Sequence, residues 1–156
     1  MTTYYKNSQA TAAAIDADGW LRTGDIGYYD ASGRLFVTGR LKSIIKCMDT
    51  KVDPFEVEQC LLELKPVAEA AVLGVPHPFF GEAPAAIVVL QEGYAGDLEQ
   101  LSRQLKDHVA GKLAVYKQLY GGIAFATKLP KNRRGKLLRR CLLDEFLNFQ
   151  KLSPIY

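Results

Sequence analysis

From residue 54 onward, the hydrophobic pattern alternates between a helical period and the short apolar runs typical of strands. The predicted order is helix, strand, strand, helix, strand, helix, over residues 54–64, 67–75, 83–90, 97–111, 122–126 and 137–149. That order favours an α+β fold, a small α/β layer in which a short sheet is flanked by about three helices. Asp53, Pro54 and Glu56 predict the first helix start through a side-chain cap, a proline at the first helical position and a capping box.

The first forty residues have a different character. A small-residue stretch predicts a short helix over residues 8–15, and two β-type runs flank a turn that ends at Gly33, which predicts a β-hairpin. Residues 41–45 are expected to form a further short strand. We therefore predict a boundary near Gly39–Leu41, with residues 1–40 as one part and 41–156 as another.

Composition excludes several classes of protein. The chain has 156 residues, of which 48% are hydrophobic and 24% charged, and its net charge of +3 is too small to indicate a nucleic-acid partner. The three cysteines are widely separated, so their spacing suggests neither a disulfide framework nor a metal site. No long apolar run predicts a membrane span, residues 1–20 lack a signal-peptide pattern, and residues 153–156 are not a peroxisomal address. We expect a reduced, cytoplasmic setting.

The loop over residues 129–136 is the most unusual stretch of the chain. Strand hydrophobicity stops at Pro130, and Gly135 frees the backbone immediately before Lys136. A lysine held on such a loop is a mobile positive charge that can reach phosphate or carboxylate oxygens. The alternatives are a solvated basic loop, a nuclear-import signal or a nucleic-acid patch. The absence of interleaved aromatic residues weakens the last of these.

Two further stretches contain candidate binding residues. Within residues 39–46, Arg40, Lys42 and Lys46 alternate with apolar residues, so on a strand they would share one face. The alternative is an ordinary exposed strand face. Asp25 follows a Thr-Gly turn at a strand start, where a carboxylate can accept hydrogen bonds from both hydroxyls of a ribose. The alternative is an aspartate that caps the turn.

Taken together, these stretches resemble motifs of the acyl-adenylate-forming superfamily, which includes acyl-CoA synthetases, 4-coumarate–CoA ligases and luciferases. Residues 20–25 (WLRTGD) look like its ribose-binding motif, and residues 39–46 (GRLKSIIK) with 52–58 (VDPFEVE) look like its hinge motif. Residues 129–136 (LPKNRRGK) look like its C-terminal lysine motif, and residues 75–82 (VPHPFFGE) also resemble the family. The resemblance covers nearly the whole chain.

The resemblance implies a role for each candidate residue. Asp25 would bind the ribose hydroxyls of ATP or AMP, Arg40 would support the same nucleotide, and Lys42 would be the hinge of a rotating lid. Lys136 would contact the substrate carboxylate and the α-phosphate during adenylation. Lys46 would serve the second half-reaction. The implied reaction joins a small carboxylic acid to AMP, at the expense of Mg²⁺-bound ATP, and then to coenzyme A.

Two departures from the family pattern bear on these expectations. The large N-terminal AMP-binding domain, with its phosphate loop and acyl pocket, is missing, so residues 1–40 would be its tail and residues 41–156 the C-terminal lid. Asp49 stands where the hinge motif usually has glycine. The sequence therefore supports the thioester step less strongly than it supports adenylation. We expect the isolated chain to be inactive. The alternatives are a non-catalytic, freestanding lid that binds or regulates a partner synthetase, and a basic nucleic-acid module.

Overall fold

The computed structural model describes residues 3–152, which fall into two compact units. The first unit ends at Lys42, and the second begins at Ser43.

The first unit contains a short helix and a hairpin, as the sequence predicted. Helix α1 (Ser8–Ala14) is capped by Asn7, whose side-chain oxygen accepts a hydrogen bond from the N–H of Ala10 at 2.9 Å. Strands β1 (Asp25–Tyr29) and β2 (Leu35–Arg40) pair antiparallel. Asp30 closes the turn between them, because its carboxylate accepts the backbone N–H groups of two turn residues.

The strand expected over residues 41–45 is not formed. Residues Leu41–Ser43 make one 3₁₀ turn, and the short strands β3 (Ile45–Cys47) and β4 (Thr50–Val52) follow it as a tight hairpin. A turn with three residues per repeat does not preserve the alternation of a strand. The prediction that Arg40, Lys42 and Lys46 share one strand face is therefore wrong, because they belong to β2, the turn and β3.

A five-stranded sheet forms the centre of the second unit. Strands β5 (Val67–His77) and β6 (Gly81–Leu90) make a long antiparallel hairpin. The other edge of β6 pairs in parallel with β7 (Gly122–Ala126) and, at its first residue, antiparallel with β3 through Cys47. Strand β4 extends the sheet beyond β3.

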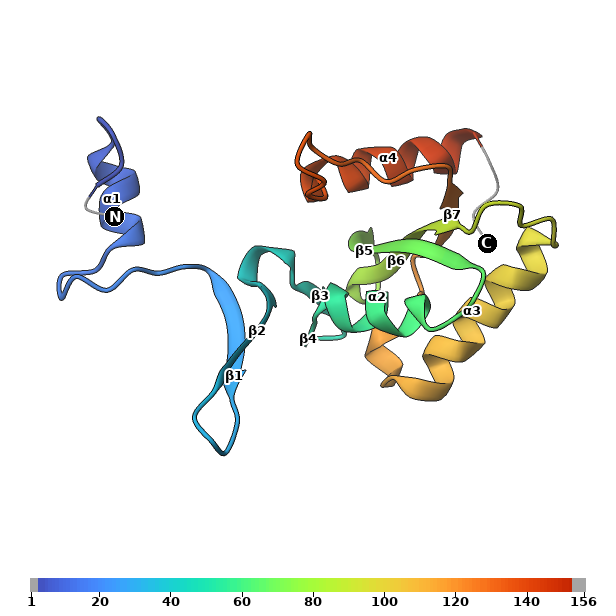
Figure 1. Ribbon diagram of the computed structural model, residues 1–156, viewed down its shortest axis with the longest axis horizontal. Coiled ribbons are helices and arrows are strands. Elements are labelled where there is room, and N and C mark those ends of the chain that lie inside the picture. Colours follow the sequence, from blue (N-terminus) through green and yellow to red (C-terminus); the bar gives the residue numbers. More distant parts are fainter. Residues whose placement is uncertain (1–2, 153–156) are drawn as a thin grey trace. The chain divides into compact units, whose positions relative to one another are not determined.

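Helices cover both faces of this sheet. Helices α2 (Pro54–Leu62) and α3 (Leu98–Lys112) lie on one side, and α4 (Arg139–Leu152) lies on the other (Figure 1). Two apolar cores result, one under α2 and α3 and one under α4. Successive residues of β6 alternate between the cores, as the period of a strand requires. The expected short sheet with three helices is confirmed.

The starts of two helices differ in detail from the prediction. Asp53 caps α2 by accepting the N–H of Phe55 at 3.0 Å, but the carboxylate of Glu56 pairs with Lys117 instead of completing a capping box. Helix α4 begins at Arg139, two residues later than expected.

The predicted inward faces of the helices are confirmed in part. Leu138 and Cys141, both predicted to face inward, are exposed, whereas the predicted core residues Leu142 and Phe146 are fully buried. The side chain of Phe149, also predicted inward, lies outside those described. Leu98, predicted in the buried stripe of α3, is at the exposed end of that stripe.

Candidate functional site

The loop that carries Lys136 is a closed turn organised by Asn132. The side-chain oxygen of Asn132 accepts the backbone N–H groups of Arg134 and Lys136, each at 2.9 Å. The backbone N–H of Asn132 donates in turn to the carbonyl of Lys136 at 2.9 Å, and Gly135 supplies the positive φ of 78° that the turn needs. Lys136 is exposed. The backbone beneath this lysine is therefore fixed, while its ammonium group is open to a ligand.

Two basic side chains that flank this loop fasten it to the rest of the second unit. On the strand side, Lys131 pairs with Glu69 of β5. On the helix side, Arg139 donates through Nη2 to the carboxylate of Glu58 on α2 at 2.9 Å and through Nη1 to the carbonyl of Val72 at 3.2 Å. The loop thus lies between two attachments to β5, and the second attachment also reaches the helix on the opposite face of the sheet.

Glu58 is a buried charge, 7% exposed, with a complete set of partners. Besides Arg139, it accepts the backbone N–H of Val72 at 2.9 Å. Burial raises the pKa of Glu58 above its usual value, and the hydrogen bond from Val72 and the charge of Arg139 offset part of that increase. Removing either partner would leave a poorly compensated carboxylate inside the domain.

Lys46 is exposed at the centre of β3, on a hairpin with an unusual turn. The backbone N–H of Lys46 donates to the carboxylate of Glu82 on β6 at 2.7 Å, which locks β3 against the main sheet. The turn residues Met48 and Asp49 both have positive φ, 51° and 57°. This is the backbone of a two-residue hairpin turn that favours glycine or asparagine. Asp49 therefore has a backbone conformation that favours glycine, the residue that the resemblance places at this position.

Asp25 and Arg40 are brought together across the β1–β2 hairpin. Arg40 Nε lies 2.8 Å from Asp25 Oδ1, and the two residues face each other in the strand register. Arg40 also donates to the carbonyl of Thr23 at 2.8 Å, and the Thr23 hydroxyl accepts the N–H of Asp25. Thr23, and not Asp25, therefore caps the turn. The Asp25 carboxylate is instead paired with the Arg40 guanidinium and stays partly exposed.

Lys42 is exposed on the 3₁₀ turn and is the last residue of the first compact unit. Lys46 and Lys136 belong to the second unit, whereas Asp25, Arg40 and Lys42 belong to the first. The sequence did not reveal three residues that shape the site: Asn132, Glu82 and Glu58. Only Asn132 had a local signal, because asparagine two residues before a turn commonly caps it.

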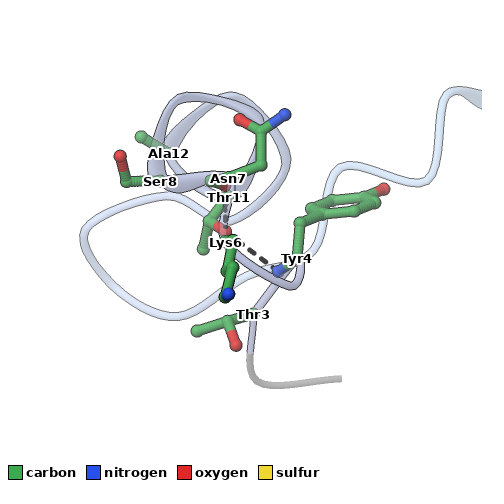
Figure 2. Close-up of a pocket in the computed structure, with 7 residues that line it drawn as sticks. All are labelled: Thr3, Tyr4, Lys6, Asn7, Ser8, Thr11 and Ala12. Carbon is green, nitrogen blue, oxygen red and sulfur yellow. Dashed lines mark hydrogen bonds between the residues drawn. The ribbon is translucent and has the colours of Figure 1, made fainter.

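Two other features carry no part of this chemistry. An open pocket beside α1 is lined by Thr3, Tyr4, Lys6, Asn7, Ser8, Thr11 and Ala12 (Figure 2). The backbone N–H of Tyr4 donates to the Thr11 hydroxyl within this lining. Within the described part of the chain, one group of side chains has metal-binding chemistry: Cys60, Glu63 and His108. Mg²⁺ prefers an octahedron of oxygen atoms, so this group does not fit the Mg²⁺ that accompanies ATP.

Residues 56–136, more than half of the chain and ending at Lys136, match the AMP-binding enzyme C-terminal domain. The chain belongs to this family of adenylate-forming enzymes. Among curated relatives, it is 41% identical to luciferin 4-monooxygenase of Nipponoluciola cruciata, over 92% of this chain and 26% of the relative. It is 43% identical to probable 4-coumarate–CoA ligase 1 of Dictyostelium discoideum, over 92% of this chain and 25% of that protein. The chain thus spans about a quarter of the length of these relatives.

Solved structures give the same result. ATP-bound MatB of Rhodopseudomonas palustris matches with a TM-score of 0.84 and 30% identity, over 92% of this chain and 28% of that chain. The o-succinylbenzoate CoA synthetase MenE of Bacillus subtilis, in complex with its acyl-adenylate, matches with a TM-score of 0.78 and 34% identity, over 91% and 28% of the two chains. None of the described helices is both long enough and apolar enough to cross a bilayer.

Proposed function

We propose that this chain is the rotating C-terminal lid, with its connecting segment, of an ATP-dependent carboxylate–CoA ligase. The observation that carries this proposal is the turn at Asn132, which fixes the backbone of an exposed lysine at the end of the matched family domain. The residues up to Lys42 would be the tail of a large N-terminal AMP-binding domain, which would be the lid's partner. A small carboxylic acid would be the substrate, and its pocket would lie in that larger domain.

In the first half-reaction, an oxygen of the carboxylate bonds to the α-phosphorus of ATP, and pyrophosphate leaves. Negative charge builds on the α-phosphate as the fifth oxygen approaches. Lys136 would donate from its ammonium group to the carboxylate and to the phosphate, and this stabilises the transition state. Such a donor is more effective when less of it has to reorganise, and the hydrogen bonds of Asn132 fix the backbone that carries it.

The nucleotide would be held by the Asp25–Arg40 pair. An ionised carboxylate is an acceptor only, so Asp25 suits the two donating hydroxyls of a ribose. Arg40 Nε already occupies Asp25 Oδ1 at 2.8 Å, which orients the carboxylate and leaves its second oxygen for the sugar. The guanidinium would also bring positive charge toward the phosphates.

In the second half-reaction, the sulfur of coenzyme A attacks the acyl carbon, the thiol proton passes to solvent, and AMP leaves. A different face of the lid would now be needed, and Lys42 would be the hinge that allows the change. Its place at the end of the first unit supports this role. Lys46 would then enter the site, on a strand that Glu82 holds in register. The described residues offer no oxygen cluster suited to Mg²⁺.

A second candidate is a freestanding lid that has lost catalysis and regulates a partner synthetase. The observation that favours it is Asp49, which adds a charge to a turn where the family usually has glycine. The two candidates differ in what Lys136 does when the lid is placed on a competent N-terminal domain.

The test joins this chain to the N-terminal portion of the Dictyostelium 4-coumarate–CoA ligase, in place of the matching C-terminal quarter. We expect the isolated chain to show no carboxylate-dependent ATP–pyrophosphate exchange and the chimera to show clear exchange. The truncated ligase without a lid is the control. Exchange by the pure isolated chain, or a chimera no better than the truncated ligase, would contradict the proposal.

A further inference from the structure

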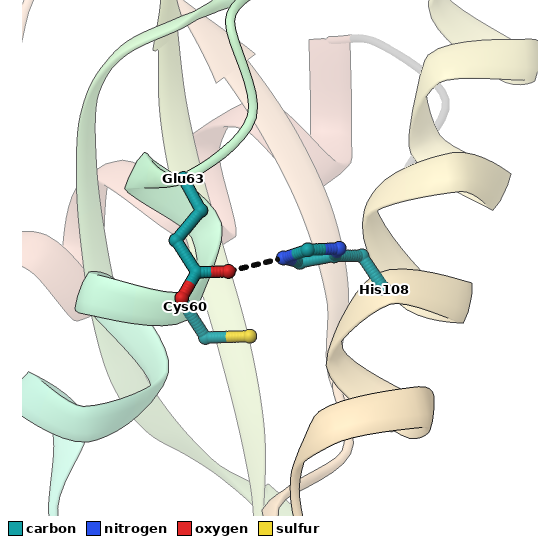
Figure 3. A group of neighbouring side chains, drawn as sticks. All are labelled: Cys60, Glu63 and His108. Carbon is teal, nitrogen blue, oxygen red and sulfur yellow. Dashed lines mark hydrogen bonds and ion pairs between the residues drawn. The ribbon is translucent and has the colours of Figure 1, made fainter.

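Three side chains with metal-binding atoms meet where α2 packs on α3. Cys60 and Glu63 are three residues apart, at the last turn of α2 and its C-terminal cap, and His108 projects from α3 toward them (Figure 3). The thiol sulfur, a carboxylate oxygen and a ring nitrogen all lie within 4.8 Å of one another. Residues three apart on a helix share a face, so two of the three ligands are set by the helix itself.

The donor set is of a recognisable type. Thiolate, imidazole and carboxylate are the three groups that bind zinc in proteins, with metal–ligand distances of about 2.0–2.3 Å and tetrahedral geometry. Ligand atoms around such an ion are about 3.3–3.8 Å apart. Side-chain rotations that move the three ligand atoms by roughly an ångström would therefore bring them to coordination distance. The sulfur is buried and the carboxylate is half-exposed, so an ion would enter from the solvent side.

The cluster already attracts a cation. Lys112 lies 2.5 Å from Glu63 Oε2, and His108 Nε2 lies 2.8 Å from the same oxygen. Glu63 Oε2 therefore already contacts both an ammonium group and an imidazole nitrogen. The C-terminal end of α2 adds partial negative charge. Lys112 is half-exposed and can move into solvent when a divalent ion takes its place.

We propose that Cys60, Glu63 and His108 form a binding site for a zinc-class divalent metal ion, with one coordination position open to solvent. On binding, the sulfur–metal bond replaces the S–H bond, and the thiol proton leaves to solvent. His108 binds through Nε2 and keeps its remaining proton on Nδ1. Because the ligands come from two helices, the ion would fasten α2 to α3 on the face of the sheet opposite α4. This site is independent of the role proposed for Lys136.

Titration of the chelator-treated 156-residue chain with Co²⁺ tests the site directly, because cobalt replaces zinc and its thiolate bond absorbs in the near ultraviolet. We expect one Co²⁺ per chain with a sulfur-to-cobalt band, and displacement of the band by Zn²⁺. The band should disappear in Cys60→Ser and in His108→Gln. It should persist in Cys141→Ser, which removes an exposed cysteine outside the cluster. No band in the wild-type chain, or a band that survives Cys60→Ser, would overturn the proposal.

Lys112→Met provides a second, opposite test. It removes the competing ammonium and leaves all three ligands, so Co²⁺ should bind about tenfold more tightly. Zn²⁺ should also raise the unfolding temperature of the wild-type chain but not that of His108→Gln, a variant at a partly exposed position. Unchanged Co²⁺ affinity in Lys112→Met would contradict the placement of the ion beside Glu63.

Discussion

The side-chain oxygen of Asn132 accepts the backbone N–H of Lys136 at 2.9 Å, and the backbone N–H of Asn132 donates back to the carbonyl of the same lysine. These two bonds close residues 132–136 into a turn. Lys131 and Arg139, which flank the turn, are tied to β5 by an ion pair and by a hydrogen bond to the carbonyl of Val72. The position of the Lys136 backbone is thus set by the sheet.

Replacing Asn132 with alanine should loosen the turn and misplace the lysine. In the chimera, Asn132→Ala should lower carboxylate-dependent ATP–pyrophosphate exchange by about 10- to 100-fold, because small displacements of a catalytic group are costly. Thioester formation from supplied acyl-AMP should change little. Asn148→Ala, an exposed position on α4, is the matched control and should leave both rates unaltered. Equal exchange in the Asn132 and Asn148 variants would contradict a positioning role.

The buried Glu58 predicts a pH dependence of stability. Its folded-state pKa is raised above the ordinary value of 4.5, chiefly by burial. The folded chain therefore binds the carboxyl proton of Glu58 more tightly than the unfolded chain does. The stabilisation that this proton adds to the folded state is fully present below about pH 4.5, and it is lost as pH rises through the folded-state pKa of Glu58. Urea unfolding at several pH values should show this loss in the wild-type chain.

The variant Glu58→Gln isolates that effect. The difference in unfolding free energy between the wild-type chain and Glu58→Gln should shift against the wild type as pH rises above 4.5. Glu92→Gln, at an exposed position, should follow the wild-type pH profile. A difference between wild type and Glu58→Gln that does not change with pH would show that burial does not perturb this carboxylate.

The positive φ of Asp49 predicts that glycine is the better residue in the β3–β4 turn. Asp49→Gly should raise the free energy of unfolding by about 0.5–1 kcal/mol, because a side chain at positive φ is strained. Asp107→Gly, at an exposed position within α3, should lower it by about 0.3 kcal/mol, because glycine is a slightly poorer helix former than aspartate. Destabilisation by both substitutions would mean that the Asp49 side chain makes a contribution that its backbone conformation does not reveal.

Local signals predicted most of the fold. Asp53 and Asp97 each precede a helical period, and both cap the helix that follows. The hairpin after Asp25 and the strand at residues 122–126 were also predicted, because turn residues bracket them. The prediction of one strand face for Arg40, Lys42 and Lys46 was wrong, because a single 3₁₀ turn is too short to produce a recognisable period in the sequence.

The site was less predictable because its supporting contacts are distant in sequence. Arg139 and Glu58 are 81 residues apart, and nothing near Glu58 distinguishes it from an exposed helical glutamate. Lys131 and Glu69 are 62 residues apart. Cys60 and His108 meet only because α2 packs on α3. The spacing of cysteines along the sequence therefore could not reveal this group. Family motifs predicted the lysines as candidates, and the structure shows which contacts hold the backbone that carries them.

The central claim is that Lys136 and Lys46 serve different half-reactions on one rotating lid. It is tested most directly by measuring both half-reactions in the chimera carrying Lys136→Ala or Lys46→Ala. Lys136→Ala should reduce acyl-AMP formation by about 10²–10³-fold and leave thioester formation from supplied acyl-AMP nearly intact. Lys46→Ala should impair the thioester step more than adenylation. Equal loss of both steps in Lys136→Ala, or no loss of either, would contradict the account.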